Sequence, residues 1–223
     1  RFFPHVGRFV WNEEWHSRCV PYLHYEHPWY HPGRLNRVIL QIGMLFDKVE
    51  LGLDDFIAQS QFAQAEAMKF LVEYNRANKY KGKTGMCWWN LRDGWPMITE
   101  AAVDYFGEKK RVFRQLKVAQ RNVLAMIDEH RNVVLCNDTL SPVTCKVEVR
   151  DAESGRLMFV GTGTCPGNGT TKIGRVSISG QGLALITYTV GGLELRNHYL
   201  YGNPPFTFTD ICRWFKRNDH VAE

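Results

Sequence analysis

Hydrophobic residues in the first half of the chain recur with the period of an α-helix. Between residues 54 and 78 the apolar positions fall one, three and four apart, which is typical of an amphipathic helix. These positions are Phe56, Ile57, Phe62, Ala63, Ala67, Phe70, Leu71 and Tyr74. The paired aspartates that follow Gly52 can cap the start of the helix, and Asn78 and Gly82 mark its end.

A short apolar run, Thr84–Trp89, follows this helix. Runs that are apolar at nearly every position are typical of strands buried on both faces, as in parallel sheets and α/β barrels. A second helix is predicted after Gly107, and its core face comprises Val112, Phe113, Leu116 and Ala119. The order helix, strand, loop, helix predicts a piece of a β/α repeat.

After residue 122 the pattern changes to short alternating runs about 8–12 residues apart, which indicates strands. They are predicted at 123–127, 133–137, 143–150, 157–161, 172–179, 183–190 and 193–200. Turns at Gly155 and at Gly191-Gly192 close two hairpins, and Thr209 caps a last short helix. The sequence therefore predicts an α+β chain. Residues 1–121 are predicted to contain this piece of a β/α repeat, and residues 122–223 are predicted to form an immunoglobulin-like antiparallel β-sandwich with a short C-terminal helix.

Composition places the 223 residues among globular proteins, with 44% hydrophobic and 23% charged residues. No apolar run reaches the roughly 18 residues of a membrane span, so no membrane partner is expected. The chain opens on RFFPHVG without an initiating Met, which we interpret as the sign of a cleaved product or a fragment. The net charge of +5 is densest over residues 109–114. No stacking aromatics are interleaved there, so we favour a solvated helix face over a nucleic-acid site.

Cysteines and short motifs add little chemistry. The six cysteines form no CxxC pair, so neither a zinc knuckle nor a redox motif is predicted. Cys136 and Cys145 can lie on neighbouring strands, which leaves a disulfide open, although unpaired buried thiols are the favoured interpretation. The N-glycosylation sequon occurs twice, as Asn137-Asp138-Thr139 and Asn168-Gly169-Thr170.

The segment from Gly85 to Pro96, GMCWWNLRDGWP, carries the most specific chemistry in the chain. It is an apolar strand that runs into a loop of Trp, Asn, Arg and Asp, a composition suited to a sugar pocket at the mouth of a barrel. Trp89 is expected either to form an aromatic platform under a sugar ring or to lie in the core. Trp88 points to the opposite side of the strand. Asp93 is expected either to accept hydrogen bonds from sugar hydroxyls or to cap a turn.

The string WWNLRDGWP, followed by AAVDYFGEKKRVF, resembles the last barrel strand of glycoside hydrolase family two. The resemblance is closest to β-mannosidase-like members, which carry Trp-Gln-Leu-Asn-Asp-x-Trp-Pro at this place. In this alignment Trp89 takes the place of the family's Trp, and Asn90 that of the Gln. Arg92 takes the place of the Asn and is the main departure, and Asp93 takes the place of the Asp. The helix SQFAQAEAMKFLVEYNR and the segments at 136–140 and 196–200 extend the resemblance over nearly the whole chain.

This resemblance implies a retaining exo-β-glycosidase of the β-mannoside or β-galactoside class that needs no cofactor. It also implies that residues 1–121 are the C-terminal part of the family's barrel. The family's two glutamates lie on barrel strands four and seven, whereas only strand eight is recognisable here, so no catalytic residue is expected in this chain. Glu13 and Glu14 are adjacent and diverge, whereas a retaining pair of carboxyl groups lies about 5–5.5 Å apart. The implied partners are a terminal β-glycoside and the rest of the barrel, and the implied location is periplasmic, secreted or lysosomal. The alternative is a non-catalytic carbohydrate-binding or structural sandwich module.

Residues 11–31 are rich in aromatic residues and histidine, which is typical of an ordered loop that lines a site. Trp15 and His16 are the predicted rim residues of the sugar site. The histidines of this segment are spaced irregularly, so no metal site is predicted. The lone strand at 84–89 leaves two edges open and is expected to pair with further protein.

Overall fold

The structure is a computed structural model that describes residues 34–50, 52–94 and 99–217. The helices in this part are α2 (Arg34–Leu45), α3 (Leu53–Ala77), α4 (Arg111–Ala119) and α5 (Phe208–Arg217). The strands are β1 (Val123–Ile127), β2 (Asn132–Asn137), β3 (Val143–Asp151), β4 (Leu157–Cys165), β5 (Gly169–Arg175), β6 (Gly182–Val190) and β7 (Leu193–Tyr201). Every strand predicted after residue 122 is present.

The chain forms two compact units, which are described separately below. Unit 1 contains the residues up to Glu66 together with Cys87–Phe113 and Pro204–Phe208. Unit 2 contains Ala67–Met86, Arg114–Asn203 and the residues from Thr209 onward. Helices α3 and α4 each contribute residues to both units. The expected domain boundary at residue 121 stays a prediction.

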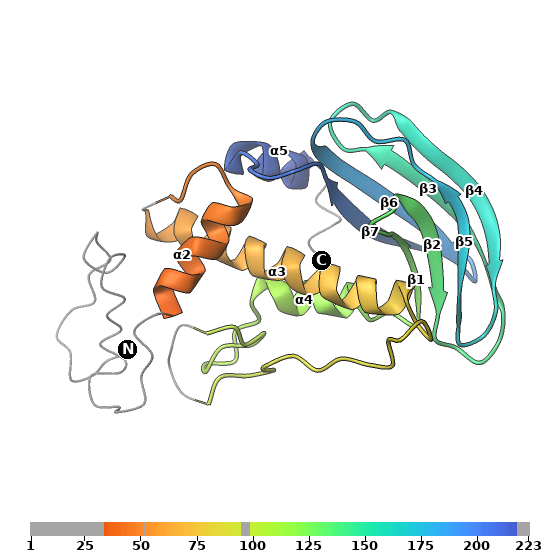
Figure 1. Cartoon of the computed structure of the whole chain (residues 1–223), viewed down its shortest axis with the longest axis horizontal. Coiled ribbons are helices and arrows are strands. Elements are labelled where there is room, and N and C mark those ends of the chain that lie inside the picture. Colours follow the sequence, from red (N-terminus) through yellow and green to blue (C-terminus); the bar gives the residue numbers. More distant parts are fainter. Residues whose placement is uncertain (1–33, 51, 95–98, 218–223) are drawn as a thin grey trace. The chain divides into compact units, whose positions relative to one another are not determined.

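Unit 2 is built on two antiparallel sheets, with strand orders β1-β2-β5 and β4-β3-β6-β7 (Figure 1). Strand β2 pairs with β5, and β3 pairs with β6, so the connections cross between the sheets as in a Greek key. This is the arrangement expected of an immunoglobulin-like sandwich. The α+β class with an antiparallel sandwich is therefore confirmed.

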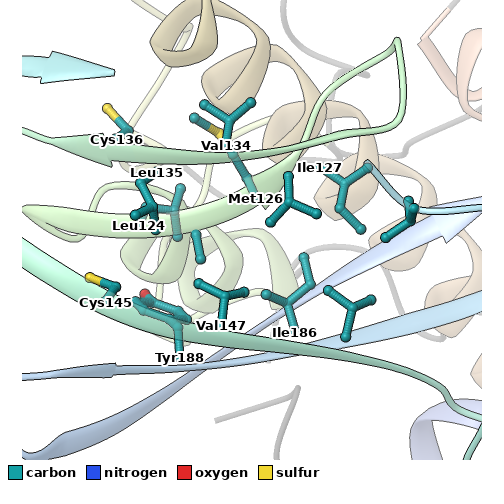
Figure 2. Packing of buried hydrophobic residues seen from close by; sticks show 14 of the residues in the cluster. Leu124, Met126, Ile127, Val134, Leu135, Cys136, Cys145, Val147, Ile186 and Tyr188 are labelled. Carbon is teal, nitrogen blue, oxygen red and sulfur yellow. The ribbon is translucent and has the colours of Figure 1, made fainter. Parts of the chain in front are cut away.

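The core of the sandwich lies between the inner faces of the two sheets (Figure 2). On one side Leu135 points inward, and on the other Val147 and Tyr188 meet it. Val147 and Tyr188 are also register partners on β3 and β6. The Tyr188 hydroxyl donates a 3.1 Å hydrogen bond to the Val123 carbonyl, so this ring is buried without losing its hydrogen bond.

A buried polar triad lies between α3 and the sandwich within unit 2. The Lys69 Nζ and Glu73 Oε2 atoms are 2.8 Å apart, and the two side chains are 4% and 7% exposed. Asn197 Nδ2 on β7 donates to Glu73 Oε1 at 2.8 Å and to the Ala125 carbonyl at 2.9 Å. The charges are tolerated in the interior because each is paired and hydrogen-bonded.

The buried face of α3 differs from the predicted apolar stripe. Buried positions on this helix include Phe56, Gln59, Phe62, Ala65, Lys69, Val72 and Glu73. Ile57, Phe70 and Leu71 are exposed although they belong to the predicted stripe, so that part of the prediction was wrong. The physical reason is that Lys69 and Glu73 satisfy each other in the interior, which allows a polar face to be buried.

The core of unit 1 is aromatic. The ring centroids of Phe46 and Phe62 lie 5.9 Å apart, and those of Phe46 and Phe208 lie 5.4 Å apart in an edge-on arrangement. Gln59 is fully buried and clamps the segment after α2. Its amide donates to the Lys48 carbonyl at 2.8 Å and accepts from the Glu50 backbone N–H at 2.9 Å.

The predicted strand at Thr84–Trp89 does not form. Its residues are extended, but none of them joins a β-ladder with the described part of the chain. An apolar run becomes a strand only when neighbouring strands accept its backbone hydrogen bonds. The expected partners of this run are therefore not among the described residues.

The turn between β3 and β4 is fixed by a carboxylate. Asp151 Oδ1 accepts hydrogen bonds from the Ser154 N–H and hydroxyl at 2.7 and 2.6 Å, and Oδ2 accepts one from the Tyr201 hydroxyl at 2.7 Å. Burial acts to raise the pKa of Asp151, but these hydrogen bonds outweigh it and hold that pKa below its ordinary value. Gly155, at φ 69°, then reverses the chain as predicted.

Helices α4 and α5 follow their predicted patterns, whereas α2 was not predicted. On α4, Val112, Leu116 and Ala119 are buried and Phe113 is half-buried. On α5, Ile211, Trp214 and Phe215 are buried. None of the described helices combines the length and the hydropathy that crossing a membrane requires. Among the described cysteines, those at 87, 136, 145 and 165 are thiols that form no disulfide.

Candidate carbohydrate site

The loop that follows the extended segment is held by backbone hydrogen bonds within unit 1. The Val103 N–H donates to the Leu91 carbonyl at 2.9 Å, and the Asp93 N–H donates to the Val103 carbonyl at 3.1 Å. The Ala102 N–H adds a bond of 3.2 Å to the Asn90 carbonyl. These bonds fix residues 90–93 although no regular strand is present.

The side chains along this loop differ in their exposure. Trp89 and Leu91 point outward and are 76% and 61% exposed. Trp88 is half-buried and Asp93 is buried. The sequence left open whether Trp89 lies in the core, and the structure places it at the surface.

Asp93 makes its contacts inside the protein. Its Oδ1 accepts a short hydrogen bond from the Thr99 hydroxyl, and its Oδ2 lies 3.5 Å from Lys110 Nζ. Lys110 also donates to the Thr99 carbonyl at 3.0 Å. The side chain of Asp93 is 1% exposed, so in this arrangement the carboxylate clamps the loop. Its role as a direct sugar ligand stays a prediction.

The other two predicted ligands of this loop differ in their exposure. Arg92 is exposed, and its Nη2 donates to the Tyr105 carbonyl at 3.0 Å. Asn90 is half-buried, and its Oδ1 accepts no hydrogen bond from the described residues. A carbonyl oxygen of this kind can accept a hydrogen bond from a ligand or from further protein.

Two aromatic residues that were not predicted as site residues are exposed in the same unit. Tyr105 and Phe106 pack edge to face, with ring centroids 5.1 Å apart. They follow the loop in the Asp-Tyr-Phe-Gly turn, and that turn was the available sequence signal. Large exposed apolar side chains usually mark a surface that contacts a ligand or another protein.

The densest basic cluster is occupied by internal contacts. Lys110 is bound to the Asp93 clamp, the Arg111 guanidinium lies 5.0 Å from the centre of the Phe62 ring, and Lys109 lies 5.0 Å from that of Phe113. Charges used in this way are poorly placed to follow a phosphate backbone. The internal contacts of Lys110 and Arg111 differ from the solvated helix face that was favoured, and the absence of a nucleic-acid partner stays a prediction.

The predicted rim residues Trp15 and His16 lie outside the described residues, as do Glu13, Glu14 and the histidines of residues 11–31. Among the residues that are described, no group of three or more His, Cys, Asp or Glu side chains is arranged to hold a metal ion.

Comparison with known proteins finds solved structures that share this fold. No model of a protein family and no curated protein sequence matches the chain. A β-D-mannosidase from Dictyoglomus thermophilum aligns with a TM-score of 0.67 and 22% identity over 78% of this chain and 23% of its own. An exo-chitosanase from Amycolatopsis orientalis gives a TM-score of 0.67 and 18% identity over 86% of this chain and 24% of its own. A structure of an exo-β-D-glucosaminidase aligns with a TM-score of 0.68 and 19% identity over 84% of this chain and 24% of its own.

These similarities show a shared fold. The chain spans about a quarter of the length of the solved structures that it matches. The alignment covers most of the described chain, so both the sandwich and the helical part enter it.

Proposed function

We propose that this chain is the C-terminal portion of a retaining exo-β-glycosidase of glycoside hydrolase family two, acting on terminal β-mannosides or β-galactosides. The main observation that supports the proposal is the fold shared with a β-D-mannosidase over 78% of this chain but only 23% of that enzyme. A fold alone does not define a reaction. The second support is therefore the loop string WWNLRD, in which Trp89 is held at the surface.

Trp89 is the proposed sugar platform. Its ring is 76% exposed although a tryptophan side chain gains substantially from burial. A pyranose ring can cover this surface with its C–H face while its hydroxyls stay free for hydrogen bonds. Arg92 and Asn90 lie beside Trp89 in sequence and supply a donor and an acceptor, and Asp93 fixes the loop through Thr99 and Lys110.

The catalytic carboxylates are proposed to lie outside this chain. Retaining hydrolysis needs two carboxyl groups about 5–5.5 Å apart, one as nucleophile and one as acid and base. Of the carboxylates near Trp89 in sequence, Asp93 is engaged by Thr99 and Lys110, and Asp104 accepts the Glu108 N–H at 2.8 Å. Both carboxylates thus hold the local backbone, which supports a catalytic pair supplied from outside this chain.

Exposed apolar surface on unit 1 supports an incomplete barrel. Leu40 and Met44 lie one turn apart on α2 and are both exposed, as is Ile57 on α3. The extended run at 84–89 has backbone groups ready for strand pairing. In the proposed enzyme, the remainder of the barrel covers these side chains and pairs with this run.

The test compares this chain with the gene product that contains it. Both are assayed with aryl β-D-mannoside, β-D-galactoside, β-D-glucuronide and β-D-glucosaminide. We expect no turnover by the 223 residues alone and hydrolysis of at least one substrate by the longer product. In that product Trp89→Ala should lower kcat/KM at least tenfold, whereas Trp89→Phe should retain part of it.

The outcomes separate this proposal from a non-catalytic carbohydrate-binding or structural module. A longer product that hydrolyses none of the four substrates would favour the module. Turnover by the isolated chain would show that the carboxylates have been placed wrongly. A Trp89→Ala enzyme with unchanged kinetics would remove Trp89 from the site but leave the glycosidase assignment standing.

A further inference from the structure

The two N-glycosylation sequons meet at one end of the sandwich, and the structure distinguishes them. We propose that Asn168 is an attachment site for an N-linked glycan in the folded protein and that Asn137 is not. The proposal concerns unit 2 and does not depend on the glycosidase assignment.

Asn137 is fully buried and its amide is used for structure. Its Nδ2 lies 2.8, 3.1 and 3.3 Å from the carbonyl oxygens of Ser141, Pro166 and Cys165. Two amide hydrogens serve these three acceptors, so one bond is shared. A glycan on Nδ2 would remove one hydrogen and force a sugar into space filled by backbone.

The hydroxyl of the first sequon is also occupied. Thr139 Oγ1 donates to Asn137 Oδ1 at 2.7 Å or to the Ser141 carbonyl at 2.9 Å. The Thr139 N–H donates to the same Asn137 oxygen at 2.9 Å. Every polar group of the first sequon therefore helps to pin the loop after β2.

Asn168 has the opposite surroundings. It is exposed on the turn between β4 and β5, and its φ of 52° is a left-handed conformation that asparagine tolerates. Its N–H donates to the Thr139 carbonyl at 2.7 Å, and its Oδ1 accepts from Lys79 Nζ at 2.5 Å. Within the described part of the chain Nδ2 makes no hydrogen bond, so the amide nitrogen is fixed in place and open to solvent.

The two sites are linked, because Asn137 binds the turn that presents Asn168. Its bonds to the Cys165 and Pro166 carbonyls hold the end of β4, and Gly167 passes so close to Leu140 that an added Cβ would lie 2.2 Å from the Leu140 carbonyl oxygen. The buried asparagine thus sets the geometry of the exposed one.

The modification is a transfer from a lipid-linked oligosaccharide diphosphate. Asn168 Nδ2 forms a bond to the anomeric carbon of the first sugar and loses one proton. The bond between that carbon and the diphosphate oxygen breaks, and the lipid diphosphate leaves with the electron pair. The transferase and its lipid-linked donor are supplied by the secretory pathway of the host used in the test.

The test expresses the full chain behind a secretion leader in eukaryotic cells and isolates the folded, monomeric, protease-resistant fraction. Peptide mapping after enzymatic glycan release should find one glycan per chain, at Asn168. Thr170→Ala should abolish it, and Thr170→Ser, which keeps the sequon, should retain it. An unmodified Asn168 in this fraction, or a glycan at Asn137, would overturn the proposal.

A second measurement needs no secretion. In bacterially produced protein, Asn168→Cys should add one more label than the parent, whose Cys87 and Cys212 are also exposed, when each reacts under native conditions with a maleimide carrying a glycan-sized polyethylene glycol. Its thermal unfolding midpoint should stay within a few degrees of that of the parent. A cysteine at 168 that is protected until the protein unfolds would show that the position cannot carry a glycan.

Discussion

The buried pair Lys69–Glu73 gives the sharpest stability prediction. Replacing Glu73 with Ala leaves the Lys69 ammonium buried without its partner and removes one acceptor from Asn197. Breaking a buried pair in this way costs about 3–5 kcal/mol. The matched control is Glu194→Ala, which breaks the exposed Arg196 pair at 2.8 Å and should cost about 0–1 kcal/mol.

The assay is equilibrium unfolding in urea, followed by circular dichroism. Glu73→Ala should lower the midpoint markedly with an unchanged slope, whereas Glu194→Ala should scarcely move it. The double variant Lys69→Met with Glu73→Leu removes both charges and should recover most of the loss, because apolar residues of similar volume can replace a buried pair. Equal midpoints for Glu73→Ala and Glu194→Ala would refute the reasoning.

Three further predictions test other parts of the molecule. Tyr201→Phe should cost about 1.5–3 kcal/mol of unfolding free energy at pH 7, since hydrogen bonds to charged groups are worth that much. Because the pKa of Asp151 is lowered in the fold, the difference in stability between the variant and the parent should shrink as the pH falls through that pKa. Urea titrations at pH 7 and at a pH below that pKa would show the change. Leu124→Ala should cost about 2–5 kcal/mol in the same assay, and Leu140→Ala, at a side chain 95% exposed, less than about 0.5 kcal/mol. Phe70→Ser should leave the melting temperature of this chain nearly unchanged and lower that of the longer gene product. Equal effects on both proteins would argue against a barrel that covers the exposed face of α3 around Phe70.

Local patterns predicted the sandwich well because its strands carry their own signals. The alternation of β3 and the glycine turn at Gly155 depend on residues that are neighbours in sequence, and β1 was placed at the residues where it is found. The buried face of α3 depended on a distant residue. Asn197 lies on β7, and without it the burial of Glu73 is not apparent from the helix alone.

In the candidate site, too, some features depend on neighbours in sequence and others on distant residues. The sequence predicted that Trp88 and Trp89 lie on opposite sides of a strand; that strand does not form, and Trp88 is half-buried whereas Trp89 is exposed. The inward position of Asp93 depends on Lys110, which comes from the segment before α4 and has no visible relation to the loop in sequence. The run at 84–89 is apolar enough to form a strand, but a strand also needs partners, and a sequence pattern does not supply them.

Helix α3 joins these observations into one argument. Its Lys69 and Glu73 are buried and paired within unit 2, while Phe70 and Leu71, the next residues along the same turn, stay exposed. A helix that packed only against the sandwich would be more stable with Phe70 and Leu71 buried in place of Lys69 and Glu73, because burying a phenylalanine or leucine is worth about 1.5–3 kcal/mol. Apolar residues kept on the outer face are therefore best explained by a second packing partner. In the proposed glycosidase that partner is the rest of the barrel, which would at once cover this face, pair with residues 84–89 and bring the catalytic carboxylates to Trp89.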